Sequence, residues 1–153
     1  MHKKIQCFLL LTLFFTSFAY AQIEDPVKWT YNVVKLAPKK FELHMTANIN
    51  GNWHIYSQNA GEGPVPTSIE FNKNPLVKWE GKVVEIGKLE NTYDPNFKSN
   101  LKFYNGKVDF VQKISTKSSA NTIISGTITY MVCNDKKCLP PKDVPFSFQV
   151  SNK

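Results

Sequence analysis

Short runs of alternating hydrophobic and polar residues recur along most of the chain. Clear examples are Val27 to Val33 and Phe41 to Ala47. Alternation with a period of two places one face of a β-strand on a core and the other in water. Val, Ile, Thr, Tyr and Phe, which suit a pleated surface, dominate these runs. Further strands are predicted at 53–56, 68–71, 77–79, 83–89, 101–104, 108–114, 122–132 and 144–150.

Three dipeptides that end in glycine interrupt the alternating runs: Asn50-Gly51, Glu80-Gly81 and Asn105-Gly106. Such pairs tolerate the positive φ angles of tight hairpins, so each is expected to be a turn. No amphipathic helix of useful length is predicted. The pattern therefore predicts an all-β fold, an immunoglobulin-like antiparallel β-sandwich. A domain of this size can bury a core large enough to fold without several disulfides.

Two segments break the strand pattern and are predicted to be loops. Residues 57–66 are rich in Gly and Pro, and residues 91–100 carry Tyr93 and Phe97 among turn-forming residues. Loops held by a rigid scaffold are where sites are commonly built.

The N-terminus has the pattern of a secretory signal peptide. A basic start, an apolar stretch and Ala19-Tyr20-Ala21 predict cleavage after residue 21, which leaves 22–153 as the single domain. The apolar stretch falls short of the roughly 20 residues that a spanning helix needs, so the mature protein is expected not to be membrane-embedded. Removal of Lys3 and Lys4 lowers the formal net charge from +7 to +5.

Composition argues against nucleic-acid binding, because all 19 basic residues are lysine and they are scattered along the chain. Signal cleavage would also remove Cys7. The remaining pair, Cys133 and Cys138, would then lie in an exported protein, where disulfides can persist.

Three roles for this cysteine pair are open. A permanent staple would stabilise by only about 2 kcal/mol, since the loop that it closes is short. A metal site for copper or zinc would combine the two thiolates with His44 and His54, although these histidines lie on different predicted strands.

The third role is thiol–disulfide exchange, which needs an accessible thiolate and a nearby resolving thiol. Lys136 and Lys137 directly precede Cys138, and positive charge favours a thiolate, whereas Asp135 opposes it. Pro140 and Pro141 donate no N–H, so they should hold the turn at the edge of the sheet. The residues alone favour exchange over the other two roles.

Several stretches resemble the N-terminal periplasmic domain of DsbD, the transmembrane thiol:disulfide interchange protein. The most specific is Thr-Ile-Thr-Tyr-Met-Val-Cys, then Cys-Leu-Pro-Pro, then a Val-Pro-Phe strand; others are 51–58, 63–67 and 103–110. The resemblance covers nearly all of the mature chain and implies an immunoglobulin-like sandwich with its redox pair at one edge.

The resemblance also implies unequal roles for the two cysteines. Cys138 matches the cysteine that forms mixed disulfides with partners, and Cys133 matches its intramolecular companion. Family members shield the pair with an aromatic cap loop, for which Phe97 is the first candidate and Tyr93 the second. Asp94 matches an acidic residue of the cap loop. His54 and Tyr56 match the strand that lines the site in the family.

We therefore expect a periplasmic module that relays electrons between a membrane thiol reductase or thioredoxin-like proteins and oxidised partner proteins. It should be a monomer that uses no cofactor, no metal and no small-molecule substrate. The membrane and thioredoxin-like domains of full-length DsbD do not follow within the 153 residues, so a stand-alone version is expected. The alternative is a secreted binding or structural sandwich with a permanent disulfide.

Overall fold

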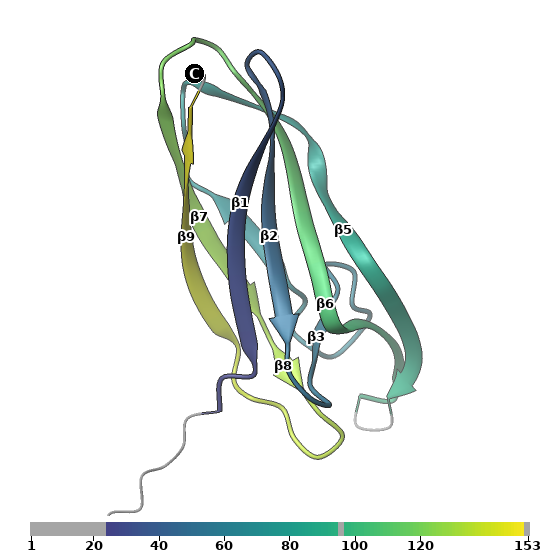
Figure 1. Ribbon diagram of the computed structural model, residues 1–153. Coiled ribbons are helices and arrows are strands. Elements are labelled where there is room, and N and C mark those ends of the chain that lie inside the picture. Colours follow the sequence, from purple (N-terminus) through teal and green to yellow (C-terminus); the bar gives the residue numbers. More distant parts are fainter. Residues whose placement is uncertain (1–23, 95–96, 152–153) are drawn as a thin grey trace, which may run out of the picture.

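Nine antiparallel strands make up the computed structural model, which describes residues 24–94 and 97–151 (Figure 1). They are β1 (Val27–Ala37), β2 (Lys40–Ile49), β3 (His54–Tyr56), β4 (Ser68–Phe71), β5 (Val77–Asp94), β6 (Ser99–Thr116), β7 (Thr122–Tyr130), β8 (Val132–Cys133) and β9 (Lys142–Val150). The described ranges contain no helix that could cross a membrane.

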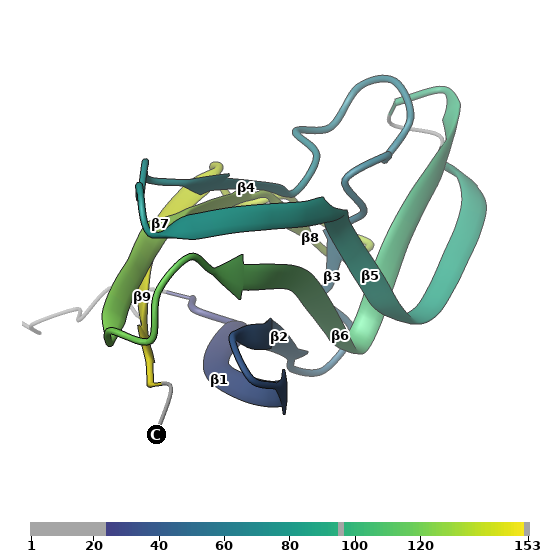
Figure 2. The same cartoon turned by 90° about the horizontal axis from the view of Figure 1, so that it is seen from above.

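The strands form two sheets that face each other across the core (Figure 2). The larger sheet has the order β1-β2-β6-β3-β8, with β5 also paired to β6; the smaller has the order β4-β7-β9. The predicted all-β antiparallel sandwich is confirmed.

The alternation seen in the sequence becomes a buried core face. In β2, Phe41, Leu43, Met45 and Ala47 are all at most 1% exposed, while the residues between them are partly exposed. These side chains meet Phe110 of β6 and Phe146 of β9 in the main hydrophobic cluster. Burial of such side chains is the dominant favourable contribution to folding.

Two of the predicted turns are wrong, because Gly81 lies inside β5 and Gly106 lies inside β6. The β5–β6 pairing shifts register next to each glycine, and both have positive φ angles, +72° and +66°. A glycine with positive φ is as well suited to a β-bulge as to a hairpin. Each pair of predicted strands is therefore one long, bent strand.

The bulge at Gly106 also marks a change of partner along β6. On one side of the bulge, residues 107–115 pair with β2; on the other, residues 103–105 pair with β3. The Asn50-Gly51 turn does separate β2 from β3, but these two strands pair with β6 and not with each other. This arrangement brings β3 alongside β8, the strand that carries Cys133.

Two further expectations need correction. The predicted strand 122–132 is interrupted at Met131, because β7 belongs to the smaller sheet and β8 to the larger one. Strands that change sheets commonly bend where they do so. The predicted loop 91–100 is mostly strand, since β5 runs to Asp94 and β6 begins at Ser99.

The predicted loop at 57–66 does connect β3 to β4. The predicted signal peptide, 1–21, lies outside the described residues.

Candidate functional site

The cysteine pair closes a tight hairpin at the end of β8. Cys133 and Cys138 face each other across an isolated antiparallel bridge and are joined by a disulfide. The Leu139 N–H donates to the Val132 carbonyl and the Asn134 N–H donates to the Lys137 carbonyl, both at 2.9 Å. The cysteines thus occupy a non-hydrogen-bonded pair, the position at which opposite side chains come closest.

The Asn134 side chain fixes the turn of this hairpin. Its Oδ1 accepts hydrogen bonds from the backbone N–H groups of Lys136 and Lys137, each at 2.9 Å. An asparagine that bonds to the backbone two and three residues ahead stabilises a turn without help from the rest of the fold. The turn between the cysteines is therefore held by hydrogen bonds of its own in addition to the disulfide.

The two sulfur-bearing residues have very different environments. Cys133 is 2% exposed, whereas Cys138 is exposed. Only Cys138 is open to a large molecule in this structure.

A small hydrophobic cluster surrounds the buried side of the pair. Cys133 belongs to it together with Tyr56, Ala60, Leu101 and Met131. Phe97 and Phe103 pack against this cluster while remaining partly exposed. We call these seven residues the site cluster.

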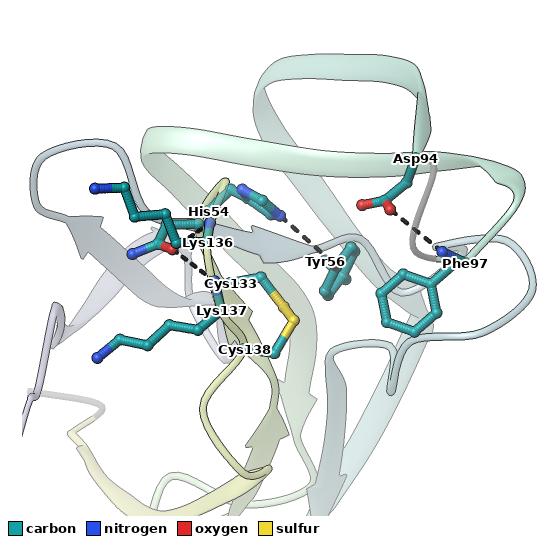
Figure 3. The surroundings of a disulfide bond; sticks show 9 residues. His54, Tyr56, Asp94, Phe97, Cys133, Lys136, Lys137 and Cys138 are labelled. Atoms are coloured by element: carbon teal, nitrogen blue, oxygen red, sulfur yellow. Dashed lines mark hydrogen bonds between the residues drawn. A yellow bond between two sulfur atoms is a disulfide. The ribbon is translucent and has the colours of Figure 1, made fainter.

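Phe97 reaches the site cluster from the turn between β5 and β6 (Figure 3). Its N–H donates to Asp94 Oδ1 at 3.3 Å, and its ring meets the Tyr56 ring edge-on with centroids 6.4 Å apart. Gly63 lies directly under the ring, because a Cβ atom there would be 2.4 Å from Phe97 Cδ1. The predicted cap residue is thus seated by a glycine of the 57–66 loop.

His54 and Tyr56 line the site from β3. His54 is the cross-strand partner of Cys133, so the two side chains share one face of the sheet. The His54 ring packs on Phe103 at 4.5 Å between centroids, and its Nε2 lies 3.4 Å from the Tyr56 hydroxyl.

Burial shifts the acid–base properties of both residues. It lowers the pKa of His54, an effect partly opposed by the negative charges of Asp94 and Asp135. Burial, together with the charge of Asp94, raises the pKa of Tyr56 to about 12. At neutral pH the imidazole is therefore mostly neutral and the phenol keeps its proton.

Other predicted site residues lie farther from the sulfurs. The amine ends of Lys136 and Lys137 extend away from the disulfide in Figure 3, and Lys137 Nζ pairs with Glu24 at 2.5 Å. Tyr93 is 58% exposed and lines a hollow of about 600 Å³ beside the hairpin, together with His54 and Asp135. The thiolate-favouring role of the lysines and the shielding role of Tyr93 stay predictions.

The structure does not bring the four alternative metal ligands together, because His54 lies beside the cysteine pair and His44 does not. His44 lies on β2, where its Nδ1 is 2.7 Å from Asp109 Oδ2 and its Nε2 is 3.5 Å from Glu42 Oε2. Among residues 24–94 and 97–151, no group of three or more His, Cys, Asp or Glu side chains is arranged to hold a metal ion.

Four members of the site cluster were not predicted as individual site residues, and neither was the glycine under Phe97: Ala60, Leu101, Phe103, Met131 and Gly63. The alternating pattern marked Phe103 and Met131 only as strand residues, and the Gly-Pro composition of 57–66 marked Gly63 only as part of a loop. No local signal in the sequence shows that Gly63 lies under Phe97, because that contact joins segments more than thirty residues apart.

Comparisons with known proteins agree with this geometry. Among solved structures, the chain is similar to the N-terminal domain of DsbD from Neisseria meningitidis in its reduced form, with a TM-score of 0.52, 14% identity, and coverage of 80% of this chain and 86% of that one. It is also similar to the N-terminal periplasmic domain of ScsB from Proteus mirabilis, with a TM-score of 0.60 and 14% identity. That match covers 81% of this chain and 46% of the other. At these identities the likeness establishes the fold, which is the predicted immunoglobulin-like sandwich.

No curated protein matches the chain in sequence. The family model for the N-terminal region of the thiol:disulfide interchange protein DsbD, however, matches residues 23–149. Because this match covers nearly the whole described domain, the chain belongs to the DsbD N-terminal domain family.

Proposed function

We propose that the protein is a periplasmic thiol–disulfide exchange module that works through Cys133 and Cys138. The observation that carries the proposal is the unequal exposure of the bonded pair, with Cys138 accessible and Cys133 buried in the site cluster. Membership of the DsbD N-terminal domain family supports the same chemistry.

The exchange would proceed in two steps from the reduced pair. The Cys138 thiolate attacks a partner's disulfide, which forms a mixed disulfide and releases one partner sulfur as a thiolate. The Cys133 thiolate then attacks Cys138 Sγ, which forms the bond seen here and releases the second partner sulfur. Two electrons pass to the partner.

The proposed partners are a membrane thiol reductase or a thioredoxin-like protein, either of which would reduce the pair, and oxidised proteins, which would accept its electrons. Phe97 would limit oxidation by small molecules by covering the buried side of the pair until a partner displaces it. The domain is proposed to relay electrons as a monomer, without a small-molecule substrate or cofactor.

A trapping experiment tests the proposal. Cys133→Ala removes the thiol that resolves the mixed disulfide formed by Cys138. Mixed disulfides with partner proteins should therefore accumulate and appear on a non-reducing gel of an oxidised periplasmic extract. Cys138→Ala is the matched control and should trap nothing, because Cys133 is buried. Equal trapping by both variants, or none by either, would contradict the proposed roles.

The alternative, a permanent structural bond, differs in its reduction potential. Structural disulfides in secreted proteins have potentials below about −300 mV, whereas exchangeable ones are more oxidising. Equilibration with glutathione buffers should place the Cys133–Cys138 bond in the exchangeable class.

A further inference from the structure

The resolving step poses a problem of proton transfer that the cysteines cannot solve by themselves. Cys133 must lose its proton before it can attack Cys138, yet it lies 2% exposed among apolar side chains. Such surroundings raise the pKa of a thiol, because they disfavour the charged form. A group beside Cys133 that accepts the proton would remove this barrier.

Two side chains on β3 are placed to take part. His54 is the cross-strand partner of Cys133, and Tyr56 belongs to the same buried cluster as Cys133. The two are connected, since His54 Nε2 and the Tyr56 hydroxyl are 3.4 Å apart. Hydrogen bonds used in proton transfer are often long in the resting structure.

We propose that His54 is the terminal acceptor of the Cys133 proton, which reaches it through the Tyr56 hydroxyl. In this step the thiol proton passes to the Tyr56 oxygen as the Tyr56 proton passes to His54 Nε2. The products are a Cys133 thiolate and an imidazolium whose Nε2–H donates to the same hydroxyl. A hydroxyl can donate to a neutral ring and accept from a charged one, so a single contact serves both states.

The pKa shifts of the two residues favour Tyr56 as the group that passes the proton on and His54 as the group that accepts it. Tyr56, with its pKa raised to about 12, cannot hold a negative charge at neutral pH and so can only pass a proton on. His54, whose pKa is lowered by burial, is neutral and ready to accept one. The imidazolium that forms faces Asp94 of β5 and Asp135 of the hairpin, which favour its charge.

The other groups around His54 do not compete for the proton. Phe103 of β6 covers one side of the ring and is apolar, and Tyr93 of β5 lines the same hollow as an exposed phenol. After the partner sulfur leaves as a thiolate, the imidazolium loses its proton to that sulfur or to water, and His54 returns to its starting state.

This inference rests on the proposed exchange function, and dithiobis(nitrobenzoate) as probe separates the two. With the reduced domain, attack by Cys138 releases one thionitrobenzoate, and attack by Cys133 on the resulting mixed disulfide releases the second. With excess reagent the second release is intramolecular, so its rate reports resolution alone. Cys133→Ala should stop after the first release, which tests the exchange function independently of His54.

The inference predicts a changed pH profile for the second release. General-base catalysis commonly contributes at least a 100-fold acceleration, so His54→Phe should slow resolution at pH 7 by about 100-fold. The deficit should shrink as pH rises, because hydroxide replaces the lost acceptor. Tyr56→Phe should show the same change, although its ring is kept. The first release should change little in either variant.

His44→Gln is the matched control, since it removes a histidine from the same sheet whose partners are Asp109 and Glu42. It should keep the wild-type profile. His54→Gln checks that loss of the ring packing is not the cause, and it should behave like His54→Phe. A wild-type pH profile in both His54 variants would overturn the inference, even if the exchange itself is intact.

Discussion

The main hydrophobic cluster and the site cluster are built by different means. The main cluster is assembled from strands whose alternating residues face one another across two sheets. The site cluster draws instead on a turn, a loop, the β7–β8 junction, the two short strands β3 and β8 and the first residues of β6, and two of its rings remain partly exposed. The first is organised for stability, and the second leaves room for one cysteine to be reached and for a ring to be moved aside.

The largest expected difference between the two clusters is in stability. Phe110 is fully buried in the main cluster, so Phe110→Ala should lower the free energy of unfolding by about 3–5 kcal/mol. Phe97→Ala should cost no more than about 2 kcal/mol, because its ring is only partly buried. Urea unfolding of the oxidised proteins measures both.

Reactivity should show the opposite order. The reduced Phe97→Ala protein should react faster with dithiobis(nitrobenzoate) than wild type, and the reduced Phe110→Ala protein should react at the wild-type rate under conditions where it is folded. If Phe97→Ala and Phe110→Ala lost the same free energy of unfolding and reacted at the same rate, the two clusters would not differ in the way described.

A smaller effect should follow from changing the support of Phe97 rather than Phe97 itself. In Gly63→Ala the new Cβ would meet the Phe97 ring, and the backbone has φ +119°. We expect a cost of about 1–3 kcal/mol from the backbone strain. We also expect faster reaction of the reduced pair, because the ring must shift.

Gly51→Ala provides the control for this strain. Gly51 also has a positive φ, +63°, but a Cβ there meets nothing within 4 Å. The free energy of unfolding of the Gly51→Ala protein should fall by roughly 1–2 kcal/mol, while its cysteine pair should react at the wild-type rate. Faster reaction in Gly51→Ala would show that strain, and not the seating of Phe97, controls access.

The same contrast explains how far the sequence could predict the structure. Period-two alternation depends on neighbours along the chain, so it predicted the strands of the main core and the antiparallel sandwich. It could not tell a hairpin from a bulge at Gly81 or Gly106, since both need the same backbone conformation. The choice is made by tertiary pairing, here by β6 joining β2 and β3 in turn.

For the site, the residues alone favoured thiol–disulfide exchange by Cys133 and Cys138 over a staple or a metal site, without showing which cysteine is buried. That difference arises because β8 joins the larger sheet beside β3 while the hairpin after it projects into solvent. The family resemblance supplied Phe97 and Tyr56 as candidates. It included Gly63 within the matching stretch 63–67 but gave that residue no role at the site, because only the folded chain places the 57–66 loop against the β5–β6 turn.

The smallest expected effect concerns the pH dependence of stability, and it again separates the two parts of the molecule. Burial lowers the pKa of His54 in the folded protein, so the folded state binds this proton less tightly than the unfolded state. The neutral imidazole therefore gives stability that is present above the unfolded pKa of about 6.5 and is lost as pH falls through and below it.

Urea unfolding at pH 7.5 and pH 5 should therefore show a smaller acid-induced loss in His54→Phe than in wild type. His44→Gln, which removes an imidazole outside the site cluster, reports what loss of any histidine does to the same difference. A loss that is unchanged in His54→Phe, or reduced equally in both variants, would mean that packing against Tyr56 and Phe103 of the site cluster does not keep His54 neutral. Since proton acceptance from Cys133 requires that neutral form, the stability measurement bears on the chemistry without any reaction being followed.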